Sequence, residues 1–238
     1  MDVEIALRAK VTLDTSMEET VNQKGIRAEI SAMRRSYGEV GLEKLPADPF
    51  VAFEEWMTEA AANEIIVEAN AMVLSTADGS GEITTRTVLL KDISQGGFTF
   101  FTNYSSRKAQ AIAMNSQVTL LFPWFAMERQ VIIKGISEKT PTNISDGYFE
   151  SRPDGSKLGA IVSNQSEVIP SRAFLEDKLK QLELDSQGKE ILRPEFWGGF
   201  LIKPVEVEFW QGRPNRLHDR IRYQLRSDFN WKIDRLAP

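Results

Sequence analysis

The sequence predicts a mainly β protein with added helices, an α+β class in which short antiparallel strands close into a barrel. Apolar or β-branched runs of strand length recur between residues 71 and 233, and glycine-rich turns separate several of them, as in all-β barrels. Helical patterns occur among these runs, but they do not alternate with them as a doubly wound sheet requires. The chain has no internal repeat and no low-complexity linker, so we expect a single folded domain.

The N-terminal part is expected to be polar and partly helical. Residues 1–29 show weak periodicity, and we interpret them as a mobile arm in front of one domain formed by residues 30–238. Residues 30–37 have the pattern of a short helix. A well-marked helix then begins with Asp48 as its N-cap and Pro49 at its first position, followed by an aromatic face.

The β-rich part begins with an apolar run at residues 71–75 and a hairpin-type turn at residues 77–81. The other predicted strands are residues 82–91, 98–102, 118–122, 130–136, 200–202, 205–210, 220–225 and 230–233. Three further helices are predicted at residues 105–114, 141–151 and 171–184.

Composition excludes several classes of protein. Cysteine is absent, so disulfides and thiolate chemistry are excluded, and with one histidine we predict no metal site. The formal net charge of −5 argues against bulk binding of nucleic acid. Neither an apolar run of about 18 residues nor a secretory signal is found, and we expect a cytoplasmic protein.

Two cations, Arg107 and Lys108, fall in the first turn of the helix predicted at residues 105–114. There they oppose the helix dipole, at a cost of roughly 0.3–1 kcal/mol each. A bound anion would remove this cost, because free N–H groups, the dipole and both side chains would converge on it. The alternative is a solvated helix start.

Arg86 and Lys91 flank an apolar strand, and in a regular strand they point to opposite faces. They could therefore serve two different anions, or simply solvate a sheet edge.

A third candidate site joins Tyr148 and Arg152, which lie on one helix face, to Ser156 after a turn. Together they would form a phosphate clamp. The alternative is a packed tyrosine and an arginine bonded to a helix carboxylate.

The most unusual stretch is residues 209–220, which contain His218, the single histidine of the chain. Three arginines, an aspartate and a tryptophan surround it. Arginine suits planar or phosphorylated anions, and histidine is the side chain most easily poised near neutral pH. A structural histidine is the alternative. No dinucleotide fingerprint, Walker loop or nucleophile elbow is present, so these residues indicate a barrel that binds a phosphorylated cofactor and a phosphorylated substrate.

Nine sequence blocks, in this order, resemble the pyridoxine/pyridoxamine 5′-phosphate oxidase family. They are Arg-Thr-Val-Leu-Leu-Lys (86–91), Phe-Phe-Thr-Asn with Ser-Arg-Lys (100–108), Glu-Arg-Gln-Val (128–131), Tyr-Phe with Ser-Arg-Pro and Ser (148–156), Ser-Asn-Gln-Ser (163–166), Phe-Trp-Gly-Gly-Phe (196–200), Phe-Trp-Gln-Gly (209–212), Arg-Leu-His-Asp-Arg (216–220) and the C-terminal Trp-Lys-Ile-Asp-Arg-Leu-Ala-Pro. The resemblance implies a split β-barrel homodimer that binds FMN at the subunit interface.

The resemblance also implies residue roles. The residues expected at FMN are Arg86, Thr87, Val88, Leu89, Leu90, Lys91, Phe101, Thr102, Arg107, Lys108, Gln130, Gln165, Ser166, Trp210 and Arg220. Those expected at the substrate are Arg34, Tyr37, Lys91, Tyr148, Arg152, Ser156, Arg216, Leu217 and His218, of which Arg216 and His218 would be catalytic. The chain departs from the common family pattern at Phe101, Lys157, Ile161 and Asn164.

The implied reaction oxidises pyridoxine or pyridoxamine 5′-phosphate to pyridoxal 5′-phosphate, in vitamin B6 synthesis and salvage. A hydride equivalent would pass from C4′ to FMN, and O2 would take the electrons to give H2O2. The alternatives are a split-barrel flavoprotein with another substrate, a non-catalytic carrier of FMN or pyridoxal phosphate, and a barrel for single-stranded nucleic acid.

Overall fold

The computed structural model describes residues 26, 29–30, 32–33, 36–94 and 96–238, and the chain divides into two units between Tyr37 and Gly38. In the first unit the predicted helix at residues 30–37 is wrong in extent. Ala32 is helical, but Met33, Ser36 and Tyr37 are not. Arg34 lies outside the described residues. The predicted domain boundary after residue 29 stays a prediction.

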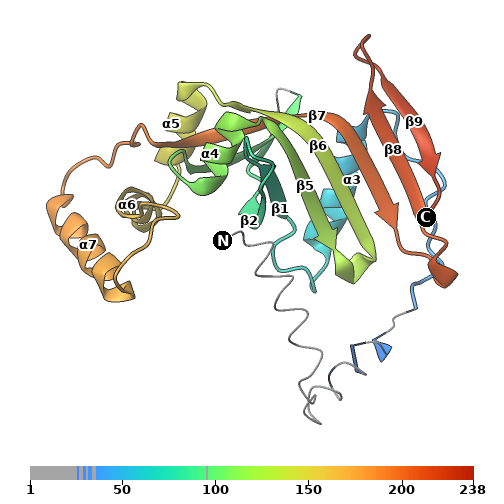
Figure 1. Ribbon diagram of the computed structural model, residues 1–238, viewed down its shortest axis with the longest axis horizontal. Coiled ribbons are helices and arrows are strands. Elements are labelled where there is room, and N and C mark those ends of the chain that lie inside the picture. Colours follow the sequence, from blue (N-terminus) through green and yellow to red (C-terminus); the bar gives the residue numbers. More distant parts are fainter. Residues whose placement is uncertain (1–25, 27–28, 31, 34–35, 95) are drawn as a thin grey trace, which may run out of the picture. The chain divides into compact units, whose positions relative to one another are not determined.

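The second unit is built on one antiparallel sheet in the order β2-β1-β5-β6-β7-β4-β3, to which β8 and β9 are added beside β7 (Figure 1). The strands are β1 (Ala71–Ala77), β2 (Ile83–Leu89), β3 (Asp92–Ser94), β4 (Gly97–Asn103), β5 (Gln117–Trp124), β6 (Arg129–Lys139), β7 (Trp197–Gln211), β8 (Asp219–Leu225) and β9 (Trp231–Leu236). The predicted α+β class with a curled antiparallel sheet is confirmed.

Strand β7 is one continuous element of 15 residues, where two shorter strands were predicted. One edge of β7 pairs with β6 from Phe200 to Gln211, with a register shift between Lys134 and Gly135. Its other edge is shared: the first half pairs with β4, and the second half pairs with β8. Pro204 lies between these halves, where the missing N–H costs no hydrogen bond to β4 or β8.

The helices are α3 (Pro49–Ala62), α4 (Arg107–Met114), α5 (Thr142–Glu150), α6 (Asp154–Val162) and α7 (Arg172–Asp185). Four of them confirm predicted helices, whereas α6 was not predicted, because Gly155 and Gly159 lower the helix propensity of this nine-residue segment. Strand β3 was also missed, since it has only three residues. Within the described residues, no helix is long and apolar enough to cross a bilayer.

The core lies between α3 and the sheet. Asp48 caps α3 by accepting a hydrogen bond from the Phe50 amide at 2.8 Å, as predicted. The helix then buries Phe53 completely, and the ring of Phe53 lies 5.0 Å from that of Phe98 on β4 and 4.8 Å from that of Phe122 on β5. These edge-to-face contacts fix α3 against the strands that carry the site.

Phe53→Ala should lower the free energy of unfolding by about 3–5 kcal/mol, because it removes a fully buried ring and leaves a cavity. Urea denaturation at fixed protein concentration measures the change. Phe174→Ala, on α7 with 39% of its surface exposed, is the control and should change stability by less than about 1 kcal/mol. Equal effects of the two substitutions would contradict this account of the core.

Candidate functional site

A cavity of about 1050 Å³ opens beside β2, the end of β4, and helices α4 and α6. It gathers fourteen of the predicted site residues: Arg86, Thr87, Val88, Leu89, Lys91, Phe101, Thr102, Arg107, Lys108, Tyr148, Arg152, Ser156, Gln165 and Ser166. Residues not predicted also line it, among them Trp197, Asn103 and Ser163. Sequence reasoning missed Trp197 because a tryptophan in an aromatic run is usually core.

Arg86 and Lys91 reach the same cavity, contrary to the opposite faces expected of a regular strand. The reason is that β2 ends at Leu89, so the alternation of side chains stops before Lys91. Leu90 is buried and does not line the cavity; its amide is bonded to the Asn70 carbonyl at 2.9 Å. This turn brings the two cations to different parts of one site.

The guanidinium of Arg86 is held against the β1–β2 hairpin. Its Nη1 donates to the Leu74 carbonyl at 3.1 Å and to the Thr76 hydroxyl at 2.9 Å, and its Nη2 donates to the Thr84 hydroxyl. Partial burial, and then the charge of Arg107, lower the pKa of Arg86. All three partners are neutral, so the positive charge of Arg86 is oriented but not compensated by them.

Lys108 is a buried cation in the first turn of α4, with 8% of its surface exposed. Its Nζ donates to the hydroxyls of Thr102 at 3.1 Å and Ser106 at 3.2 Å, and to Gln165 Oε1 at 2.7 Å. Burial, and then the charge of Arg86, lower the pKa of Lys108 to about 8. A buried ammonium whose hydrogen-bond partners are neutral is unfavourable unless an anion joins it.

The N-terminus of α4 adds backbone donors to this cationic group. Ser106 is the N-cap residue, but its side chain makes no capping hydrogen bond. The Arg107 amide donates to the Ser166 hydroxyl at 3.2 Å, and the Arg107 side chain is exposed and paired with Glu82. Arg86, Lys108 and the helix N-terminus are therefore arranged so that they could hold an anion; the anion predicted at this helix start stays a prediction.

A second group of donors lies beside an aromatic wall of the same cavity. The ring of Phe101 stacks on Tyr148 at 4.0 Å and on Trp197 at 5.6 Å. The prediction that Arg152 shares a helix face with Tyr148 is wrong, because α5 ends at Glu150 and Arg152 lies in the turn after it. The Arg152 guanidinium lies 4.7 Å from the Trp197 ring, and its Nη1 is buried without a hydrogen-bond partner. Burial lowers the pKa of Arg152, against the opposing effect of Tyr148. An unsatisfied, buried guanidinium N–H is a suitable donor for a phosphate oxygen.

Six further predicted residues form a second cluster that does not line the cavity. Gln130, Trp210 and Arg220 are register partners and form one row across β6, β7 and β8. The Trp210 ring lies 4.7 Å from the ring of His218, and Arg216 and Leu217 belong to the loop before β8. None of these six residues lines the cavity.

The second cluster also has its own supports. Arg220 donates to both carboxylate oxygens of Glu208, at 2.7 and 2.9 Å, and this pairing raises the pKa of Arg220. The Arg213 amide donates to Nδ1 of His218 at 3.0 Å. The cluster is thus a prearranged group of side chains on strand ends.

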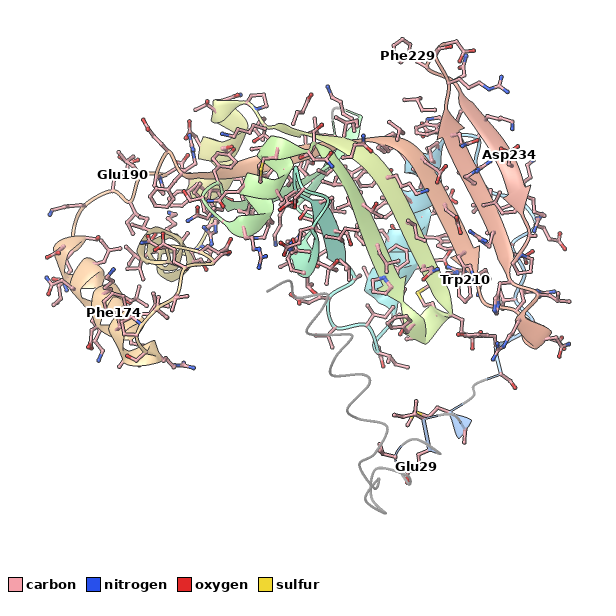
Figure 2. The ribbon with its side chains drawn as sticks, viewed as in Figure 1. Glu29, Phe174, Glu190, Trp210, Phe229 and Asp234 are labelled. Carbon is pink, nitrogen blue, oxygen red and sulfur yellow. The ribbon has the colours of Figure 1, made fainter. Side chains whose placement is uncertain are left out.

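Within one chain the cavity and the second cluster lie at opposite ends of β7. Trp197 at the start of β7 lines the cavity. Trp210, which is labelled in Figure 2, lies thirteen residues further along the strand. At about 3.3 Å per residue this is roughly 40 Å of strand. Tyr37 is half-buried in the first unit, and its predicted role at the substrate stays a prediction.

Known proteins match this chain over most of its length. Residues 58–184 match the family model described as "Pyridoxamine 5'-phosphate oxidase", and residues 197–238 match that of the "Pyridoxine 5'-phosphate oxidase C-terminal dimerisation region". The chain is 57% identical over 212 residues to the pyridoxine/pyridoxamine 5′-phosphate oxidase of Flavobacterium psychrophilum, covering 88% of this chain and 99% of the relative. The corresponding protein of Nostoc sp. is 47% identical over 211 residues, covering 88% and 98%.

The fold is also similar to that of solved structures. PhzG from Burkholderia lata 383, in complex with tetrahydrophenazine-1-carboxylic acid, has a TM-score of 0.78 and 27% identity, covering 86% of this chain and 100% of that one. A pyridoxamine 5′-phosphate oxidase-related, FMN binding protein from Nostoc punctiforme has a TM-score of 0.65 and 16% identity, covering 82% and 100%.

Lys108→Met should stabilise the ligand-free protein at pH 7, because it removes a buried charge. Below pH 8 Lys108 is protonated in both the folded and the unfolded states, so burial of its charge lowers the stability of the folded state by the full amount. Between pH 8 and the ordinary value of 10.5 the folded state loses the proton first, so the stability of the unsubstituted protein should rise, by up to about 3 kcal/mol relative to the variant. Urea denaturation across this pH range measures the difference.

The control is Lys178→Met, which removes an exposed lysine of α7. In this variant the free energy of unfolding should still rise between pH 8 and 10.5, as it does in the unsubstituted protein. If the Lys108 variant and the unsubstituted protein respond to pH in parallel, then the buried charge of Lys108 is not the unfavourable group inferred here.

Proposed function

The chain belongs to the pyridoxine/pyridoxamine 5′-phosphate oxidase family, and on that basis we propose which of its residues bind the cofactor and the substrate. It is an FMN-dependent oxidase with the split β-barrel fold of this family. It oxidises pyridoxine and pyridoxamine 5′-phosphate to pyridoxal 5′-phosphate and forms a homodimer.

The FMN phosphate fits the cationic end of the cavity. The observation that carries this assignment is Lys108, a buried ammonium bonded to neutral oxygens. Arg86 offers a second fixed cation, and the start of α4 offers backbone N–H groups. A dianion here would compensate charges that the protein leaves uncompensated, which is the condition for a strong phosphate site.

The rest of FMN is assigned to the surface between the two groups of donors. The segment Thr87–Leu89, Phe101 and Thr102 lines this part of the cavity. Gln165 is held in place by hydrogen bonds from Thr102 at 3.1 Å and from Lys108 at 2.7 Å. Lys108, which is assigned to the FMN phosphate, therefore also fixes Gln165 in the part of the cavity assigned to the flavin ring.

The substrate phosphate is assigned to Lys91, Tyr148, Arg152 and Ser156. These residues share the cavity with the FMN group and come from α5, the turn between α5 and α6, α6, and the turn after β2. The buried Nη1 of Arg152 without a partner supports a second phosphate, because leaving such a donor unsatisfied is costly. Flavin binding alone does not require these residues, so they favour the oxidase over a flavoprotein that only carries FMN.

We propose that dimerisation joins the cavity of one copy to the second cluster of the other. Trp197 at the start of β7 lines the cavity of a chain, but the six residues of the second cluster do not, which supports a site shared between two copies. Gln130, Trp210 and Arg220 of the second copy would then complete the FMN site, and its Arg216 and His218 would contact the substrate. Residues 197–238, which match the dimerisation region, include all of these except Gln130.

When bound, FMN supplies the redox chemistry, since it accepts a hydride equivalent from C4′ of the substrate and passes the electrons to O2 to give H2O2. The protein's task is to hold the substrate by its phosphate and orient its ring, which can lower a barrier by roughly 7–11 kcal/mol. Arg216 would favour the negative charge that develops on the ring oxygen. His218 would hydrogen-bond the substrate.

A cytoplasmic location also stays a proposal, supported by the absence of cysteine.

The visible spectrum tests the function directly. The visible absorption band of the bound flavin should disappear when pyridoxine 5′-phosphate is added to the FMN-loaded protein without oxygen. It should return on aeration, with formation of H2O2. Non-phosphorylated pyridoxine is the matched control and should bleach the flavin far more slowly, because it cannot use Arg152. A flavin band that ignores the phosphorylated substrate would contradict the proposed function.

Arg86→Ala and Arg216→Leu should separate cofactor binding from turnover. The first should weaken FMN binding by about tenfold or more, since it removes a charged donor from the phosphate site. The second should lower kcat roughly a hundredfold while FMN stays bound. FMN fluorescence titration and peroxide formation measure the two effects. Arg172→Ala, at a side chain that is 92% exposed, should change neither; the reverse pattern for the two arginines would refute the assignment.

A further inference from the structure

The loop between β7 and β8 carries both residues proposed to act on the substrate ring, and its backbone is unusual. Asn215 and Arg216 are consecutive left-handed residues, with φ of 57° and 62°. Such a conformation is unfavourable for residues other than glycine and persists only where the surrounding contacts impose it. The contacts that hold this loop therefore determine where Arg216 and His218 lie.

The carboxylate of Asp219, at the first position of β8, is the centre of those contacts. Its Oδ2 accepts a hydrogen bond from the Leu42 amide at 2.9 Å, and its Oδ1 accepts one from Arg235 on β9. Arg213, on the other side of the loop, has its Nε 3.7 Å from Oδ2. The Asp219 side chain is 22% exposed. One carboxylate thus joins both ends of the loop to β9 and to the segment before α3.

Arg213 transmits this restraint to the histidine. Its backbone N–H donates to Nδ1 of His218 at 3.0 Å, so Nδ1 is an acceptor and carries no proton. The neutral imidazole must then carry its proton on Nε2, which makes that nitrogen a hydrogen-bond donor. Movement of Arg213 would release the ring and its tautomer together.

We propose that Asp219 is a positioning residue for the oxidation, one that fixes Arg213 and so the orientation of Arg216 and the donor form of His218. This rests on the proposed function, which places those two side chains at the substrate. Asp219 itself touches neither cofactor nor substrate in this account.

The FMN site should not depend on Asp219, and this separates a positioning role from a structural one. The neighbouring Arg220 is held independently by the bidentate pairing with Glu208 and by the Ala237 carbonyl at 3.0 Å. Trp210 belongs to the ladder between β6 and β7. Loss of the Asp219 charge should therefore disturb the substrate side of the second cluster and leave its FMN side in place.

The test compares Asp219→Asn with Asp234→Asn in the FMN-loaded dimer. Asp234 is a matched control: its side chain is 25% exposed and pairs with Arg222 and Lys232, away from the loop. Asp219→Asn should lower kcat/KM for pyridoxine 5′-phosphate by about tenfold or more, in keeping with the sensitivity of oriented reactions to small displacements. Its FMN dissociation constant should stay within about twofold of the unsubstituted protein, and its Tm should match that of the control.

Arg213→Ala provides a second route to the same conclusion. It should lower kcat/KM in the same way, and the double variant should lose little more than either single one, because both act through one contact. Unchanged kcat/KM in Asp219→Asn would overturn the proposal, and so would parallel loss of FMN binding and Tm. If the unsubstituted protein fails to oxidise the substrate, the proposed function itself is wrong, which is a separate result.

Discussion

The pairing of β7 with its neighbours is the constraint on which the rest of the structure depends. Strand β6 occupies one edge of β7 from Phe200 to Gln211, and the other edge is divided between β4 and β8. The β4 half leads directly to the cationic start of α4. The β8 half leads to the loop with Arg216 and His218. Strand β7 thus positions both the cavity and the second cluster, and it places them at its opposite ends within one chain.

A second constraint is that the site holds positive charge in positions that folding alone would not favour. Lys108 is buried among neutral oxygens, and the pKa of Arg86 is lowered by burial and by Arg107. Both cations donate hydrogen bonds to neutral hydroxyl, carbonyl and amide oxygens, which orient them without neutralising their charge. Such a site is arranged for a ligand that brings its own negative charge. Burying the uncompensated cations lowers the stability of the ligand-free protein, and the aromatic core between α3 and the sheet offsets this loss.

Much of the fold, and fourteen of the residues that line the cavity, could be predicted from the sequence. The Asp48-Pro49 start of α3, the hairpin after β1 and the cations at the start of α4 are each defined by a few adjacent residues. The continuity of β7 was not predictable, because Lys203-Pro204 resembles a strand end and only pairing with β6 carries the strand through it.

The parts of the site that the sequence did not reveal depend on distant contacts. Trp197 joins the cavity because Phe101 and Arg152 pack on it. The early end of β2, which brings Lys91 to the same cavity as Arg86, depends on the hydrogen bond from the Leu90 amide to the Asn70 carbonyl. The predicted residues divide into two clusters because of the way the strands pair in the sheet. Sequence motifs do not reveal this pairing. In the proposed dimer, that division also makes catalytic competence a property of association. Two chains damaged in different clusters can complement each other in a mixed dimer, and dilution below the dimer dissociation constant separates the two halves of each site.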